Sequence, residues 1–121
     1  MHPEVCPSKL DPALRPLLAR EEAESLERWF EVLASATRLR LLHALGVLED
    51  PCMGDLAEAV GMKPQAVSNQ LRRLVDRGIL ATRRHGNHIH YRLVDAPIAK
   101  LLQQGLCLNE ESKGHLGGTP P

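Results

Sequence analysis

Aromatic side chains are scarce in this chain of 121 residues, where they make up 2% of the sequence: Trp29, Phe30 and Tyr91. Binding of single-stranded nucleic acid by base stacking needs aromatic platforms, so this mode of binding is disfavoured. Long apolar runs are also missing, and we therefore expect no membrane span. Residues 1–12 lack the apolar segment of a secretory signal, which favours a cytoplasmic location.

Cysteine is rare as well, with three residues at Cys6, Cys52 and Cys107. An odd number of cysteines in a protein expected inside the cell favours free thiols over a disulfide framework. Enzyme signatures are lacking too, because the sequence has no nucleophile elbow, glycine-rich phosphate loop, HExxH pair or paired-carboxylate motif. We therefore do not expect an enzyme.

Charge is balanced overall, with 15 Lys and Arg residues against 15 Asp and Glu residues, but it is unevenly distributed. Residues 63–92 contain seven basic side chains and one acid, Asp76, which gives this segment a charge of +6. Residues 1–62 carry −5 and residues 93–121 carry −1. A cationic lobe on an otherwise acidic chain favours binding to the phosphates of nucleic acid.

The segment 61–78 has the pattern of a DNA-recognition helix. Pro64 suits the first helical turn, which tolerates the missing N–H, and Gly78 suits the end of a helix. Apolar residues recur at helical spacing and predict one buried stripe: Val67, Leu71 and Leu74. The remaining face carries side chains of the types that contact base edges and phosphates: Gln65, Ser68, Asn69, Arg72 and Arg73. We predict that this helix enters the major groove of DNA.

A β-hairpin rich in Arg and His is predicted directly after this helix, with its turn at Gly86 and Asn87. Alternation predicts one face that packs on a core: Leu80, Thr82, Ile89, Tyr91 and Leu93. The other face is cationic or hydrogen-bonding: Arg83, His85, His88, His90 and Arg92. We predict DNA contacts from Arg83, Arg84 and His88. A hairpin whose charged face is simply solvated is the alternative.

Four more helices are predicted, over residues 17–33, 37–48, 53–60 and 97–108. Asp50-Pro51 is expected to end the second of them, and Asp95 to cap the last. The second helix is the most apolar, and His43 within it is expected to be a hydrogen-bonded core residue. Its inward positions are predicted to be Leu39, Leu42, Leu45 and Val47, with Leu41 and Leu48 beside them.

The order of these elements predicts a mainly α fold, a winged helix-turn-helix with about five helices and a β-hairpin wing. We divide the chain into three parts by composition. Residues 1–16 are expected to be a flexible N-terminal arm, and residues 17–108 the DNA-binding and dimerisation domain. Residues 109–121 are polar and rich in glycine and proline at their end, so we expect a disordered tail.

Four stretches in this order resemble the ArsR/SmtB family of bacterial metal- and stress-responsive repressors. They are LASATRLRLLHAL (33–45), CMGDLAEAVGM (52–62), AVSNQLRRLVDRGIL (66–80) and RRHGNHIHYRL (83–93). Each stretch alone is a weak signal, whereas their combination is specific. The resemblance implies a homodimer that binds operator DNA and blocks transcription. An inducer that binds the DNA-incompetent state more tightly then shifts the population away from DNA.

The family resemblance also implies that the two terminal helices form the dimer interface. Residues 18–33 and 98–106 each carry an apolar stripe, and a domain of this size does not easily bury both within one protomer. A two-fold dimer presents two recognition helices to the duplex, so the expected partner is a palindromic double-stranded operator. The alternative is that both stripes cap the core of a monomer.

Two metal sites recur in the family, and this chain departs from both. One uses a Cys-x-Cys motif at the start of the third helix together with cysteines of the N-terminal arm. Cys52 matches its first cysteine, Gly54 stands at the second, and Cys6 lies in the arm. The other uses Asp and His on the last helix. Asp95 matches its first ligand, but Pro97 and Leu108 stand at two histidine positions, so this zinc site is expected to be lost.

Cys6, Cys52 and Cys107 are therefore the candidate metal ligands. Thiolates are soft donors, so we expect a thiophilic inducer: mercury, arsenic, cadmium or lead, with copper(I) and zinc also compatible. The runner-up is a thiol redox or persulfide sensor of the same fold. The alternative is that Cys52 and Cys107 are small buried apolar residues and that Cys6 is a residue of the arm without a role.

Two other hypotheses stay open. His85, His88 and His90 share one hairpin face and offer imidazoles that suit zinc or nickel, although contacts to DNA are the simpler role. A winged helix also serves in some proteins as a protein-binding module, and the +6 lobe argues against that function here.

Overall fold

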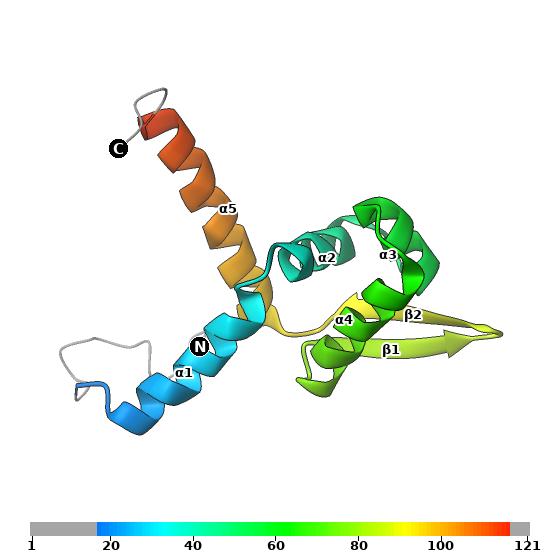
Figure 1. Ribbon diagram of the computed structural model, residues 1–121, viewed down its shortest axis with the longest axis horizontal. Helices are drawn as coiled ribbons and strands as arrows, with labels where there is room; N and C mark the ends of the chain where they lie inside the picture. Colours follow the sequence, from blue (N-terminus) through cyan, green and yellow to red (C-terminus); the bar gives the residue numbers. More distant parts are fainter. Residues whose placement is uncertain (1–16, 117–121) are drawn as a thin grey trace, which may run out of the picture.

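The computed structural model describes residues 17–116, with side chains described to residue 112. The described residues form five helices and one two-stranded hairpin: α1 (Arg20–Leu33), α2 (Ala36–Val47), α3 (Met53–Val60), α4 (Pro64–Asp76), β1 (Leu80–His85), β2 (His88–Leu93) and α5 (Ala96–Leu116). Figure 1 shows α2, α3, α4 and the hairpin gathered in one body, from which α1 and α5 project. This arrangement confirms the predicted winged helix-turn-helix. The predicted arm, 1–16, lies outside the described residues.

The core lies where α2, α3 and α4 meet the start of the wing. Its buried members are Leu41, Leu42, Leu45, Leu56, Ala57, Val60, Val67, Leu71, Leu74, Ile79, Leu80 and Ile98. The inward stripe predicted for α4, Val67, Leu71 and Leu74, is therefore confirmed. Burying a leucine or valine side chain fully contributes about 1.5–3 kcal/mol, so this cluster supplies most of the apolar stabilisation of the body.

The face of α2 that points inward differs from the prediction. Leu41 is fully buried, whereas Leu39 is 37% exposed and Val47 is 66% exposed. A helix turns by ~100° per residue, so a core centred on Leu41 and Leu45 places His43, halfway between them, on the opposite side. His43 is exposed, and the prediction of a core histidine is wrong.

Helix α5 begins at its predicted capping residue, but its end differs from the prediction. The backbone N–H of Ile98 donates to Oδ1 of Asp95 across 3.0 Å, which confirms the predicted cap of α5. This helix continues to Leu116, beyond its predicted end at residue 108, and residues 117–121 of the predicted tail lie outside the described residues. The segment 109–113 contains good helix formers and no Gly or Pro, and the next glycine is Gly114.

The hairpin has the predicted turn and the predicted alternation, but the face expected to pack on the core is covered only in part, because Thr82 is exposed and Ile89 is 40% exposed. Gly86 has φ 64°, and a glycine at this first central position is typical of a type II′ turn. Leu80 pairs with Leu93 and Thr82 with Tyr91 on one face, while the other face joins three pairs: Ala81 with Arg92, Arg83 with His90, and His85 with His88.

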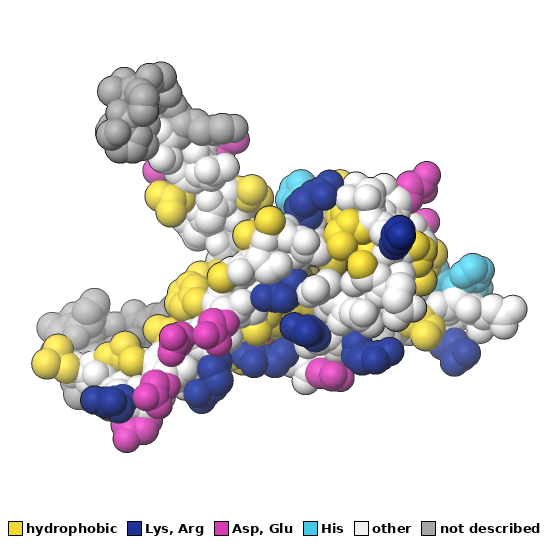
Figure 2. Space-filling model, in the orientation of Figure 1, with side chains coloured by type: hydrophobic (Ala, Val, Ile, Leu, Met, Phe, Trp, Pro, Cys, Tyr) yellow, Lys and Arg dark blue, Asp and Glu magenta, His cyan; other side chains and the backbone are white. Residues whose placement is uncertain are grey.

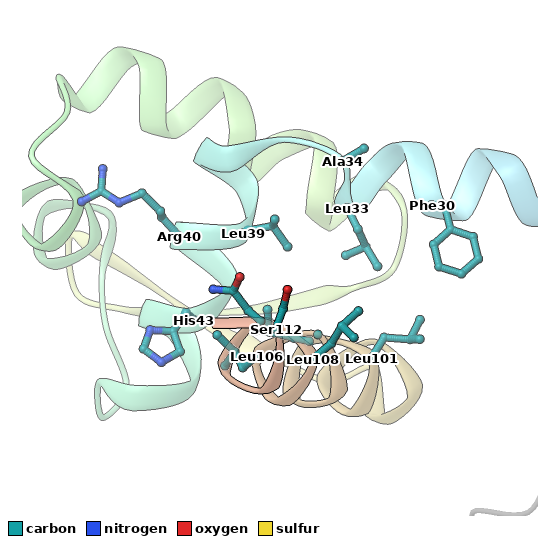
Figure 3. Close-up of a pocket in the computed structure, with 13 residues that line it drawn as sticks. Phe30, Leu33, Ala34, Leu39, Arg40, His43, Leu101, Leu106, Leu108 and Ser112 are labelled. Carbon is teal, nitrogen blue, oxygen red and sulfur yellow. The ribbon is translucent and has the colours of Figure 1, made fainter. Parts of the chain in front are cut away.

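The terminal helices leave apolar side chains uncovered. Four of them are between 41% and 49% exposed: Leu26, Phe30, Leu101 and Leu106. Phe30, Leu101 and Leu106 line an open apolar hollow of about 960 Å³ between α1, α2 and α5, together with Leu33 and Leu39 (Figure 3). Other members of the two stripes pack on the core, namely Trp29, Leu33, Ile98 and Leu102, so one protomer covers the stripes only in part. Among the described residues, no helix is long and apolar enough to span a membrane.

Candidate nucleic-acid interface and thiol site

Helix α4 buries its apolar stripe and presents a polar face to solvent. Gln65, Asn69, Arg72 and Arg73 are exposed, and Ser68 is half-buried. Gln65 and Asn69 lie one turn apart, and Nε2 of Gln65 donates to Oδ1 of Asn69 across 3.3 Å. Both amides keep further donors and acceptors free for base edges, since each amide group has several. The site residues predicted on this helix thus lie together on an accessible surface.

The wing adds a second cationic surface beside this helix. Arg83, Arg84 and His88 are exposed, and Arg84 lies opposite Ile89 near the hairpin tip. Figure 2 shows Lys and Arg side chains spread over the body of the molecule, while acidic side chains gather along α1. This separation matches the charge polarity of the sequence and suits a surface that approaches phosphates.

Arg38 holds α4 in place, a role that sequence analysis missed. Its Nη1 donates to Oε1 of Gln70 on α4 across 3.2 Å. Its Nε and Nη2 donate to the carbonyl oxygens of Val32 and Glu31, at 2.5 and 3.0 Å. These carbonyls belong to the last turn of α1, which lacks partners within the helix. A single side chain therefore joins the end of α1 to the candidate recognition helix.

Cys52 is the N-cap residue of α3 and is half-buried. Its backbone N–H donates to Oδ2 of Asp55 across 3.0 Å, and its Sγ–H donates to the same oxygen across 3.3 Å. The backbone hydrogen bond from Cys52 is the main cause that lowers the pKa of Asp55, with the thiol, His90 and His88 acting in the same direction. Cys52 is thus held at the surface by its cap.

The segment before α3 is attached to the wing. Asp50 forms an ion pair with Arg83, and its carbonyl oxygen accepts a hydrogen bond from Nδ1 of His90 at 2.7 Å. The carbonyl oxygen of Pro51 accepts the N–H of Tyr91 at 2.9 Å. Cys52 itself pairs with His90 in an isolated antiparallel bridge. The sequence pattern predicts only a helix-ending role for Asp50 and only a DNA contact for Arg83.

Of the three predicted metal ligands, the structure describes Cys52 and Cys107, which belong to different helices. Cys107 is exposed on α5, which packs on α2, whereas Cys52 starts α3. Cys6 lies outside the described residues. Among residues 17–112, no three His, Cys, Asp or Glu side chains are arranged to hold a metal ion, and this includes the wing histidines. Cys52 therefore offers one soft, half-buried donor, and no three-ligand group among residues 17–112 includes it.

Comparisons with known proteins agree with this architecture. Residues 35–88 match the MarR family. A transcriptional repressor of Synechocystis described as an SmtB homologue is 33% identical over 73% of this chain and 66% of its own length. The regulator NmtR of Mycobacterium tuberculosis is 37% identical over 83% of this chain and 81% of NmtR. The chain belongs to the ArsR/SmtB family of winged-helix transcriptional regulators.

A solved structure extends the likeness of this ArsR/SmtB protein over nearly the whole described chain. The crystal structure of AntR, an antimony-specific transcriptional repressor, superposes with a TM-score of 0.77 at 55% identity. The match covers 87% of this chain and 96% of AntR. The relatives are thus regulators of transcription, and the resemblance inferred from the four sequence stretches is confirmed.

Proposed function

We propose that the protein is a homodimeric repressor that binds a palindromic DNA operator and releases it when its cysteine thiolates bind a thiophilic ion. The observation that carries the DNA-binding half is the exposed face of α4, where Gln65, Asn69 and Arg72 lie side by side next to a cationic wing. Arg suits guanine, and Asn and Gln suit adenine, so the set is able to read base edges in the major groove.

The second subunit is inferred from the uncovered faces of the terminal helices. Phe30 and Leu106 are nearly half exposed, and both line the hollow between α1, α2 and α5. Apolar patches of this kind on a small domain mark interaction surfaces. A second copy that covers them gives a two-fold dimer, whose recognition helices then contact half-sites about 34 Å apart.

The inducer is inferred from the thiols and from the likeness to AntR. A repressor named as antimony-specific is 55% identical to this chain, and trivalent antimony belongs with arsenic among the thiophilic ions. Such an ion prefers sulfur ligands, which makes Cys52, Cys6 and Cys107 the candidates. Binding displaces the thiol proton, so Cys52 loses the Sγ–H donor that contacts Asp55 in this structure.

The coupling between ion and DNA is a linkage between two binding equilibria. In proteins of this kind, an effector typically changes the affinity for its second ligand by about 5- to 150-fold, or about 1–3 kcal/mol. A repressor of this kind has to share one compartment with its DNA, and we therefore propose that the protein is cytoplasmic. A thiol redox sensor of the same fold gives the same output with an oxidant or persulfide as its input.

The test starts from a duplex that the wild-type protein selects out of a random-sequence pool. Fluorescence anisotropy then measures the Kd for this duplex, in the presence of a thiol-free reductant, with and without trivalent antimony. Arsenite, Hg(II) and Cd(II) are compared in parallel, and hydrogen peroxide, added after the reductant has been removed, serves as the redox arm. Release by a thiophilic ion supports the proposal. Selection of no duplex contradicts the DNA-binding half, and release by peroxide alone favours the redox sensor.

A further inference from the structure

The segment of residues 50–52 lies along the wing like a short additional strand. The N–H of Tyr91 donates to the carbonyl oxygen of Pro51 at 2.9 Å, and Cys52 forms a bridge with His90. Pro51 is buried, so this contact is part of the packed structure. We use the term wing seam for these two backbone contacts together with the contacts of Asp50.

Asp50 holds both strands of the wing from one position. Its carboxylate pairs with Arg83 on β1, while its carbonyl oxygen accepts from His90 on β2. Its φ of 51° is left-handed, a conformation that Asp and Asn adopt more readily than most residues. This backbone conformation turns the chain at the end of α2, so that both the carboxylate and the carbonyl of one residue face the hairpin.

We propose that Asp50 is a positioning residue that fixes the wing against the start of α3 and thereby couples an ion on Cys52 to the DNA-contacting hairpin. The coupling rests on the proposed function. Cys52 belongs to the same three-residue segment, and its backbone pairs directly with β2. Because Cys52 is tied to β2 in this way, a shift of Cys52 on ion binding would be transmitted through the wing seam to the hairpin.

The ion pair with Asp50 also engages the guanidinium of Arg83. A guanidinium bound to Asp50 is less available to a phosphate than a free one, so Arg83 serves first to orient the wing. Both partners are about half exposed, at 55% and 52%, and exposed ion pairs contribute little to global stability. We therefore expect changes at Asp50 to alter the position of the wing and the response to the ion, and to leave folding intact.

Asp50→Asn is the decisive variant, because asparagine keeps the size, the carbonyl group and the tolerance of positive φ while it removes the ion pair. Glu49→Gln is the matched control, since Glu49 is an exposed neighbouring acid with no ion pair among the described residues. Arg83→Gln removes the same ion pair from the other side.

Three measurements are made on each full-length protein. Antimony-thiolate absorbance counts bound trivalent antimony, and anisotropy gives the ratio of duplex Kd values with and without the ion. Hydrogen exchange at the Tyr91 amide reports whether its bond to Pro51 is closed. We expect Asp50→Asn to bind antimony as wild type does and to show a Kd ratio at least about threefold smaller, as for residues coupled by direct contact. We also expect faster Tyr91 exchange in this variant, and in the wild-type protein after antimony is added.

Wild-type exchange at Tyr91 together with an unchanged Kd ratio in Asp50→Asn overturns the inference. A loss of response in Glu49→Gln equal to that in Asp50→Asn also overturns it, because a general charge effect then explains the result. If antimony fails to release wild-type protein from DNA, the proposed inducer fails and the coupling with it. Tyr91 exchange in ion-free Asp50→Asn still decides whether Asp50 positions the wing. For a variant that no longer binds the duplex, the exchange rate of the Tyr91 amide alone decides whether the wing seam is closed.

Discussion

Arg38 donates from Nη1 to Oε1 of Gln70 across 3.2 Å, and this bond joins α2 to the exposed helix α4. The other nitrogens of the same guanidinium bind the last carbonyls of α1. The helix that carries the uncovered apolar face and the helix that carries the candidate base contacts therefore share one side chain. Arg77 adds a second link, because its guanidinium lies 4.6 Å from the ring centre of Trp29.

Replacing Gln70 by alanine is expected to weaken duplex binding more than it weakens folding. The change removes the contact of Arg38 with α4 and leaves its bonds to Val32 and Glu31 in place. Loss of one hydrogen bond costs about 0.5–1.5 kcal/mol. Arg38→Met removes all three bonds, leaves two carbonyls without these partners, and is expected to cost about 1–3 kcal/mol. Urea melts and anisotropy measure the two effects, and duplex binding by Gln70→Ala equal to wild type contradicts the link.

Arg72→Ala is expected to weaken binding to the selected duplex by about 1–3 kcal/mol if Arg72 contacts a base or a well-placed phosphate. Arg72 is exposed on α4 and lies outside the core, so the melting temperature is expected to stay unchanged. Arg20→Ala is the control, because it removes the same charge from an exposed position at the start of α1, away from this face of α4. Full affinity and an unchanged salt dependence in Arg72→Ala would argue against α4 as the recognition helix.

The fold could be predicted from the sequence because it depends on local patterns. The stripe of Val67, Leu71 and Leu74 and the alternation in the hairpin each depend on residues a few positions apart. The missed contacts depend on residues that are distant in the chain: Asp50 and His90 are 40 positions apart, and Arg38 and Gln70 are 32 apart. No local pattern separates an Asp-Pro pair that ends a helix from one that also holds a wing, because the partner is chosen by the tertiary fold.

A charge in the hollow between the terminal helices is expected to separate the dimer. Leu106→Asp is a clean choice, because Leu106 is 44% exposed within the protomer and contributes little to its core. An aspartate buried against a second apolar face lacks a partner and carries a large desolvation cost. Analytical ultracentrifugation is expected to show monomers at micromolar concentration, and duplex binding is expected to fall with dimer content.

Gln104→Asp is the control for this experiment, because it places the same charge two residues away at a position that does not line the hollow. It is expected to remain dimeric and to bind the duplex as wild type does. A wild-type protein that sediments as a monomer and still binds a palindrome tightly would contradict the proposed assembly.

Serine in place of Cys52 is expected to leave duplex binding intact and to abolish release by trivalent antimony. Serine preserves the size of the side chain and is a good N-cap residue, so α3 keeps its start. It lacks the soft thiolate that a thiophilic ion prefers. Binding is followed by anisotropy and bound metal by absorbance, and release of Cys52→Ser at wild-type antimony concentrations contradicts the assignment.

Mixing single-cysteine variants tests whether the ion site is shared between subunits. Cys6→Ser is expected to act in the same direction as Cys52→Ser, with a weaker effect if the thiol must first be ordered, because ordering a chain segment costs entropy. If each ion site consists of Cys6 of one protomer and Cys52 of the other, a homodimer of either single variant lacks one ligand at both of its sites. A mixed dimer of the two variants restores one intact pair, and half of the wild-type antimony binding is expected to return. Cys107→Ser tests the third candidate ligand. Loss of the response in this variant alone places the ion site on α5. Retention of the response in all three variants excludes a cysteine sensor and leaves the wing histidines as the next candidate ligands.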